Sequence, residues 1–303
     1  MTSTLDETDI KICQLLLGNS RLPYDYMAGK LNLSINAVHK RVKGLVDVGT
    51  IRRFVAHPSL LAVNAINIWI FGRSRSTRIL DLHLRLKNND STYWVAYSGG
   101  AYLYVGAYLR DISELESYSD FVKTEAEMED LTIGILPSFP KRTSDDEFHR
   151  VDYQIISSLH NDSRKPLTDV ASELGVTVKT VRSRLERMIE RNLIEITLEW
   201  YPDASDDIVA LLHLTLKPEA KKVDVSNSLI GNFSPNLLFT IPFGNIPNTL
   251  VSFAWTNTMR QLETLRAKTA ELEGVDSVNL NVLQIGYSYD TWRDKTVLER
   301  CKV

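Results

Sequence analysis

The sequence predicts an α+β protein built as a tandem repeat, and two observations carry that prediction. Residues 9–51, moved by 143 positions onto residues 152–194, give eleven identities in 43 aligned pairs without a gap. Average residue usage would give roughly two or three identities over such a window by chance. In addition, a helical spacing of apolar residues is followed in each half by strand-like runs in the same order. One structural unit is therefore used twice.

Each copy of the repeated segment predicts three short helices. Apolar residues recur at three- and four-residue intervals, and on the third helix Ile35, Val38, Val42 and Leu45 are expected to face inward. Pro23 and Pro166 mark the start of the second helix. Ser34 and Thr177 stand just before the third helix, where their hydroxyls can cap free backbone N–H groups. About two residues separate the second helix from this cap, Asn32-Leu33 in the first copy and Gly175-Val176 in the second. A turn this short, with Asn or Gly in it, is typical of a helix-turn-helix.

A short strand is expected after each third helix and would form a wing. In the first copy it covers residues 50–55, and Arg52 and Arg53 could meet a phosphate backbone. In the second copy it covers residues 193–200, where Glu195 and Glu199 would be repelled by phosphate. We therefore expect the two copies to differ as readers of DNA.

A second pattern, strand-helix-strand-strand-helix-strand, follows each helical module. In the first half the expected elements are strand 65–71, helix 77–87, strand 92–97, strand 102–108, helix 112–126 and strand 130–136. In the second half they are strand 207–216, helix 223–230, strand 237–241, strand 249–255, helix 259–272 and strand 277–285. This βαββαβ order is that of the ferredoxin-like fold, whose sheet leaves one face open. We expect the two halves to cover these faces for one another, sheet to sheet.

Local charge predicts a DNA-binding role for the third helices. Residues 30–53 carry six Lys or Arg against one Asp, and residues 179–191 carry five against two Glu, in a chain of net charge −3 and pI near 6.1. Such basic faces release counterions when they bind DNA. The solvent-exposed face of an ordinary helix can carry the same pattern of charge. The predicted DNA-binding residues are Ser34, Asn36, His39, Lys40, Arg41, Lys43, Arg52, Arg53, Thr177, Lys179, Arg182, Ser183, Arg184 and Arg187.

These features together resemble the Lrp/AsnC family of feast/famine transcriptional regulators. The resemblance rests on residues 5–10, 38–42 and 49–54 in the first copy and on residues 151–155, 181–185 and 192–194 in the second. It implies two winged helix-turn-helix protomers fused in tandem, a pseudo-dimer that binds double-stranded, pseudopalindromic DNA. It also implies further pairing through the ferredoxin-like domains, as a homodimer or higher oligomer, and a small-molecule effector such as an amino acid.

The effector site departs from that pattern. Responsive members place an Asp three residues after a Gly in the turn between the second and third strands, whereas Gly100 and Gly244 are followed there by Leu103 and Pro247. The residues at these turns that are expected to contact an effector are Gly99, Gly100, Tyr102, Gly244 and Asn245. The simpler interpretation is that these glycines only allow the turns to form and contact no ligand.

Two other functions remain open. Siroheme decarboxylases are similar in architecture, but their His-Cys-Tyr type stretch corresponds here to residues 92–97, which contain neither His nor Cys. The chain could also have lost DNA binding and act as a module that binds a ligand or another protein. Basic faces buried against the sheet domains would favour that reading.

No other chemistry is predicted. The six histidines are scattered singly, and Cys13 and Cys301 do not form a disulfide framework, so we expect no metal, no cofactor and no enzymatic activity. We expect no membrane segment and a cytoplasmic, nucleoid-associated location. The expected domains are 1–58 and 148–202 (winged helix-turn-helix) and 59–137 and 203–286 (ferredoxin-like), with a linker at 138–147. The tail, 287–303, would be a short helix packed on the second half or a partner-binding extension.

Overall fold

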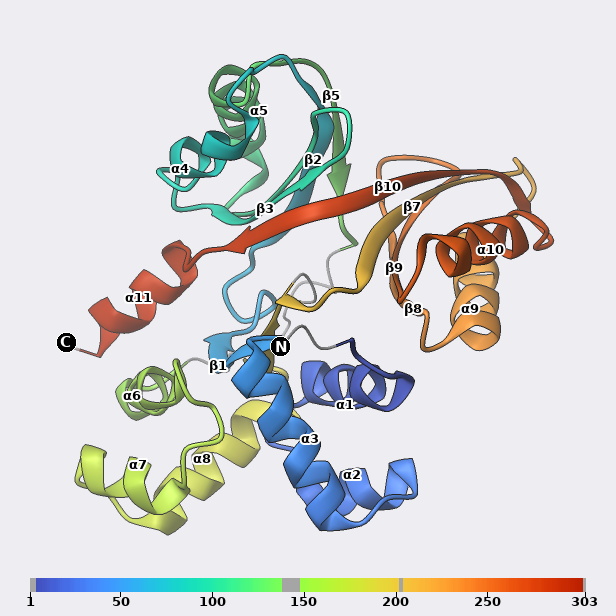
Figure 1. Cartoon of the computed structure of the whole chain (residues 1–303). Helices are drawn as coiled ribbons and strands as arrows, with labels where there is room; N and C mark the ends of the chain where they lie inside the picture. The colour runs from blue at the N-terminus through green and yellow to red at the C-terminus, as the bar shows by residue number, and fades with distance from the viewer. Residues whose placement is uncertain (1–3, 138–147, 202–203, 302–303) are drawn as a thin grey trace. The chain divides into compact units, whose positions relative to one another are not determined.

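The computed structural model describes residues 4–137, 148–201 and 204–301, which form two compact units (Figure 1). The helical unit contains residues 11–65, 148–201 and 290–301, and the sheet unit contains residues 4–10, 66–137 and 204–289. The predicted linker at 138–147 lies outside the described residues. Within the described part of the chain, no helix is long and apolar enough to cross a membrane.

The three helices predicted in each copy are present. They are α1 (Glu7–Gly18), α2 (Tyr24–Leu31) and α3 (Ile35–Val48) in the first copy, and α6 (Arg150–Leu159), α7 (Leu167–Leu174) and α8 (Val178–Glu190) in the second. The C-cap residue after α2 is Asn32, with φ 55°, and the C-cap residue after α7 is Gly175, with φ 65°. This left-handed geometry suits Gly and is tolerated by Asn, which explains the residues found in the two turns.

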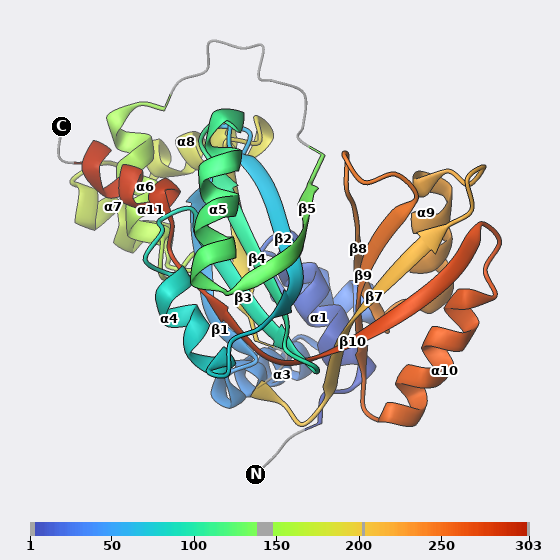
Figure 2. The ribbon, with the colours of Figure 1, turned by 90° about the horizontal axis from the view of Figure 1, so that it is seen from above.

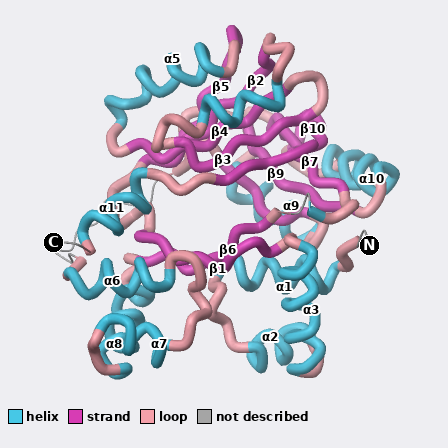
Figure 3. Tube along the Cα trace, turned by 60° about the vertical axis from the view of Figure 1, so that its left-hand side comes forward, coloured by secondary structure: helices cyan, strands magenta, loops and turns pink. Residues whose placement is uncertain are grey.

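The strands that follow α3 and α8 do not form separate wings, which corrects that expectation. Strand β1 (Ile51–Pro58) pairs antiparallel with β6 (Ile194–Trp200), with Phe54 opposite Leu198. Each module supplies only one strand at this position, so the strand of the other module satisfies its backbone N–H and C=O groups. Figure 3 shows this ribbon between the helices of the two modules.

The inward face of the helices agrees with the predicted stripe except at its first residue. Val38, Val42 and Leu45 are buried, but the Ile35 side chain is 53% exposed, so the expectation that it faces inward was wrong. The tail forms the expected helix, α11 (Trp292–Arg300), which packs against α6 and β1. Its Val297 joins a core cluster with Ile155 and Leu159 of α6.

The sheet unit contains the predicted βαββαβ order twice. The first half consists of β2 (Ile66–Ser74), α4 (Leu82–Leu86), β3 (Thr92–Ser98), β4 (Tyr102–Leu109), α5 (Leu115–Glu125) and β5 (Met128–Ile135). The second half consists of β7 (Ile208–Leu216), α9 (Lys222–Phe233), β8 (Leu237–Pro242), β9 (Thr249–Thr256), α10 (Met259–Ala270) and β10 (Val275–Ser288). Short 3-10 turns, Ile79–Asp81 and Ile112–Glu114, precede α4 and α5. The mixed α+β fold is confirmed.

One strand joins the two halves edge to edge, which the sequence did not predict. The strand order is β5-β2-β4-β3-β10-β7-β9-β8, so β10 pairs with β7 over Val275 to Val282 and with β3 over Leu283 to Ser288. Figures 1 and 2 show β10 running through both halves, with α4 and α5 beside the first and α9 and α10 beside the second.

The faces that the helices leave uncovered pack together, as expected. Trp69, Phe71 and Tyr104 of the first half form one buried cluster with Phe243 and Val251 of the second. At the edge of this cluster the Gly244 N–H donates to the Ile135 carbonyl at 2.7 Å. The open faces of two ferredoxin-like sheets are therefore buried against each other.

Candidate nucleic-acid interface

The two helix-turn-helix modules meet at a pseudo-two-fold axis. The Oγ atoms of Ser20 and Ser163, which are equivalent residues 143 positions apart, lie 2.5 Å from each other in the buried centre of the contact. The loops that carry them, just before α2 and α7, meet in Figure 3. Equivalent residues that contact each other across an axis are the signature of an isologous interface.

Two equivalent arginines complete this contact reciprocally. Arg21 donates to the carbonyls of Ser163 and Lys165, and Arg164 donates to those of Ser20 and Leu22. Burial lowers the pKa of Arg21, and the nearby Arg164 guanidinium lowers it further. Two of the identical pairs that revealed the repeat, Ser20/Ser163 and Arg21/Arg164, therefore lie at the interface between its copies.

The predicted residues of α3 form an exposed polar face. Asn36, His39, Lys40 and Lys43 are exposed, whereas Arg41 is half-buried. The His39 ring meets Tyr24 edge-on at 5.4 Å between centroids. Ser34 caps the helix by accepting the Ala37 N–H at 3.2 Å, as expected. This face combines amide, imidazole and ammonium donors between residues 36 and 43 of the helix.

Helix α8, the equivalent of α3 in the second copy, presents a smaller basic face. Lys179, Arg182 and Ser183 are exposed, and Thr177 caps the helix through the Thr180 N–H at 3.1 Å. Arg184 and Arg187 instead bind the fully buried Asp152 carboxylate of α6, at 3.2 and 2.7 Å. These two arginines hold α8 on α6 while remaining partly accessible. A shallow hollow on this surface is lined by His149, Thr180, Ser183, Arg184 and Arg187.

Arg53, Glu195 and Glu199 of the β1–β6 ribbon each have an oppositely charged partner. Arg53 binds Glu199 on the neighbouring strand and donates to Asn161 at 2.5 Å, and the Glu199 hydrogen bond raises the pKa of Arg53. Glu195 binds Arg293 of α11 at 2.7 Å. Arg52 is exposed and lies over the Tyr201 ring at 5.2 Å. The two glutamates that were expected to repel phosphate thus each have a cationic partner.

The residues expected to bind an effector lie at two turns of the sheet unit. Gly99 and Gly100 are exposed between β3 and β4, and Gly100 has φ 67°. Tyr102 follows them and packs near Tyr104, with ring centroids 5.2 Å apart. The Asn245 amide is used structurally: its oxygen accepts the Ile135 N–H and its nitrogen donates to the Ile133 carbonyl, both at 2.7 Å. Gly244 also bonds Ile135.

The helical modules match a known family. The AsnC-type helix-turn-helix domain matches residues 5–46 and again residues 150–189. The chain therefore carries two AsnC-type helix-turn-helix domains in tandem. Its relatives include the HTH-type transcriptional regulator AldR of Mycobacterium tuberculosis, 29% identical over 38% of this chain and 66% of that protein. Another is the HTH-type transcriptional regulator LysM of Sulfurisphaera tokodaii, 44% identical over 16% of this chain. That match covers 36% of LysM, so the tandem protein spans less than two thirds of either relative.

The two-repeat architecture also occurs in a solved structure. The siroheme decarboxylase NirDL superimposes with a TM-score of 0.62 over 98% of this chain and 99% of that chain, at 12% sequence identity. This likeness shows a shared fold. The two predicted AsnC-type modules and the tandem arrangement of the fold are therefore confirmed.

Proposed function

We propose that this tandem protein is a sequence-specific DNA-binding transcriptional regulator of the Lrp/AsnC type. The observation that carries the proposal is the pairing of two AsnC-type modules about the Ser20–Ser163 contact, with a reading helix on each side. Regulators of this architecture place the last helix of each helix-turn-helix, here α3 and α8, in the major groove of one half-site. The names of AldR and LysM, both HTH-type transcriptional regulators, support the same function.

The exposed faces of α3 and α8 have the chemistry for this role. Asn36 can pair with adenine, Lys40 and Lys43 with guanine or phosphate, and the exposed Ile35 side chain with a thymine methyl group. On α8, Lys179 and Arg182 offer the same kinds of donor. Arg41 and Arg184 contact phosphates of the DNA backbone, which position the protein on the duplex, rather than read bases.

The test is a titration of the purified chain with its own upstream DNA over a series of salt concentrations. We expect sequence-preferring binding whose logarithmic affinity falls linearly with the logarithm of salt concentration. A competitor of shuffled sequence measures the preference. Absence of binding at low salt would contradict the proposal.

The two reading faces are expected to contribute unequally. Four helix positions are equivalent in the two copies. On α3 they are occupied by Asn36, His39, Lys40 and Lys43, and on α8 by Lys179, Arg182, Ser183 and the exposed Glu186. We therefore expect Lys40→Glu/Lys43→Glu to weaken binding more than Lys179→Glu/Arg182→Glu, with the salt slope reduced by about two. Lys87→Glu/Lys123→Glu in the sheet unit makes the same charge change as a control. Equal losses from both reading-helix variants would contradict the asymmetry.

An effector and an enzymatic alternative are tested in the same preparation. A small molecule that acts on the sheet unit should shift the DNA titration, and a panel of amino acids is the first set to try. The similarity to NirDL makes an absorbance spectrum worthwhile. A tetrapyrrole band together with absent DNA binding would favour the siroheme decarboxylase alternative.

A further inference from the structure

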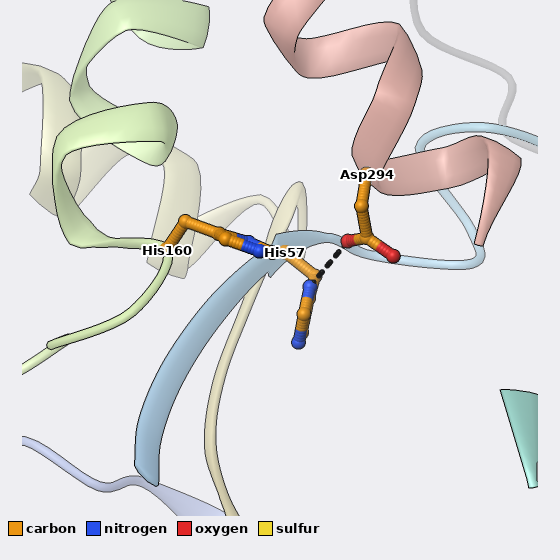
Figure 4. Close-up of side chains that lie close together, drawn as sticks. All are labelled: His57, His160 and Asp294. Atoms are coloured by element: carbon orange, nitrogen blue, oxygen red, sulfur yellow. Dashed lines mark hydrogen bonds and ion pairs between the residues drawn. The ribbon is translucent and has the colours of Figure 1, made fainter. Parts of the chain in front are cut away.

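Three side chains with metal-binding chemistry converge in the helical unit. His57 lies near the end of β1, His160 directly follows α6, and Asp294 lies in the first turn of α11 (Figure 4). One potential ligand atom from each lies within 4.8 Å of the other two. The chain separates these residues by more than a hundred positions, so no local spacing announces the cluster.

The cluster is enclosed and its members are held in place. The side chains of His57, His160 and Asp294 are 11%, 17% and 7% exposed. His57 Nδ1 lies 2.5 Å from Asp294 Oδ1, and the two imidazole rings meet edge-on with centroids 5.2 Å apart. The second Asp294 oxygen accepts the Thr291 N–H at 2.7 Å, which fixes the carboxylate in its capping position.

An outer layer orients the second imidazole. His160 Nε2 lies 3.5 Å from Asp290 Oδ2, which leaves Nδ1 as the nitrogen that could bind a metal. A carboxylate partner of this kind sets the tautomer and direction of a metal-binding histidine. Arg53, which lies 3.4 Å from Asp290, balances the additional negative charge.

We propose that His57, His160 and Asp294 form a binding site for a divalent transition-metal ion of the Zn²⁺ type, with a fourth position left for water. Two imidazoles and one carboxylate are a ligand set that zinc uses in proteins. Around a tetrahedral ion with bonds of about 2.1 Å, donor atoms lie about 3.4 Å apart, so side-chain shifts of about 1 Å bring the present atoms into place.

A metal at this place would tie three segments together. His57 belongs to the first helix-turn-helix copy, His160 to the second, and Asp294 to the C-terminal helix α11. Because the ion would bind the folded arrangement and not the unfolded chain, its binding free energy would add to the stability of the helical unit. The site is independent of the exposed faces of α3 and α8.

The experiment is a calorimetric titration of the chelator-treated full-length chain with Zn²⁺ alone, repeated with Co²⁺ to record its visible absorption. We expect one equivalent to bind the wild type, and His57→Gln and His160→Gln each to weaken binding at least tenfold. Asp294→Asn should also weaken it while an amide oxygen still caps α11. A metal-dependent rise in melting temperature should be present in the wild type and lost in these variants.

Two controls keep the result interpretable. His83→Gln removes an imidazole from the sheet unit, and Glu299→Gln removes an exposed carboxylate from α11 itself, so both should bind Zn²⁺ as the wild type does. Near-ultraviolet circular dichroism of the metal-free proteins reports whether each variant keeps its tertiary structure. Absence of saturable binding, or wild-type affinity in both His57→Gln and His160→Gln, would overturn the proposal.

Discussion

Individual charged residues in this protein act mainly through their partners. Asp152 shows this most clearly, because its carboxylate is fully buried and binds both Arg184 and Arg187. A buried carboxylate is tolerated only when cations and hydrogen bonds compensate for lost hydration. Two arginines that look like DNA contacts in the sequence therefore also serve as the compensation for one buried acid.

His213 illustrates the opposite case, an imidazole kept neutral by burial. Its Nε2 lies 2.6 Å from the Tyr104 hydroxyl, which in turn accepts a hydrogen bond from Asn281 at 2.6 Å. Burial lowers the pKa of His213 from 6.5 to about 4. The folded protein therefore resists a proton that the unfolded chain accepts readily.

This difference predicts a loss of stability in acid. Above pH 6.5 His213 is neutral in both states and contributes nothing, whereas between pH 6.5 and 4 only the unfolded state is protonated. The expected loss attributable to this residue is about 2 kcal/mol at pH 5. His213→Gln, which keeps a polar partner for Tyr104, should flatten the pH dependence of urea unfolding over this window. An unchanged slope in His213→Gln would refute the assignment.

Sequence predicted residues well where local rules decide their roles. Ser34 and Thr177 cap their helices because capping depends on only three neighbouring residues. Ile35 was placed inward by its spacing, but its side chain, in the first turn of α3, is exposed. His57, His160 and Asp294 could not be grouped, because only tertiary folding brings them together.

At the scale of elements, the sheet unit depends on close approach of the two halves. Gly134 of β5 lies against the ring of Phe243, and the space that a methyl group would need is already occupied by that ring. Phe243 is only 1% exposed and belongs to the cluster shared by the halves, so it has little freedom to move. The absence of a side chain at 134 is what allows this contact.

We therefore expect Gly134→Ala to destabilise the protein by about 1–3 kcal/mol through overpacking. Gly99→Ala is the matched control, because no atom lies within 4 Å of its new methyl group and its backbone requires no left-handed conformation. That variant should unfold within about 0.5 kcal/mol of the wild type. Chemical denaturation followed by near-ultraviolet circular dichroism measures both, and equal stabilities would show that Phe243 can shift at no cost.

The order of elements was predictable, whereas their pairing across the repeat was not. Periodicity identifies β1, β6 and β10 as strands because it reports which faces are buried. It does not report the neighbour of each strand, and both the β1–β6 ribbon and the double pairing of β10 are contacts between distant segments. Because of those contacts, each of the two compact units contains residues from both repeats.

At the scale of the whole molecule, both reading helices belong to one chain. The Ser20–Ser163 contact and the β1–β6 ribbon are intramolecular, so the pair forms on folding. We expect one chain to occupy one pseudopalindromic site with half-sites about 34–36 Å apart. Stoichiometric titration of a labelled duplex, monitored by light scattering, should saturate at one chain per duplex. Saturation only at two chains per duplex would show that each chain reads a single half-site.

Because the two copies are fused in one chain, a mutation can change one reading helix and leave the other unchanged. In a regulator made of two identical subunits, every substitution in a reading helix appears in both half-sites at once. Here the equivalent positions already differ, as with Lys43 and Glu186 or His39 and Arg182, while the axis residues Ser20 and Ser163 remain the same. On the proposed function, each reading helix can therefore change its preferred bases alone, and the DNA target need not be symmetrical.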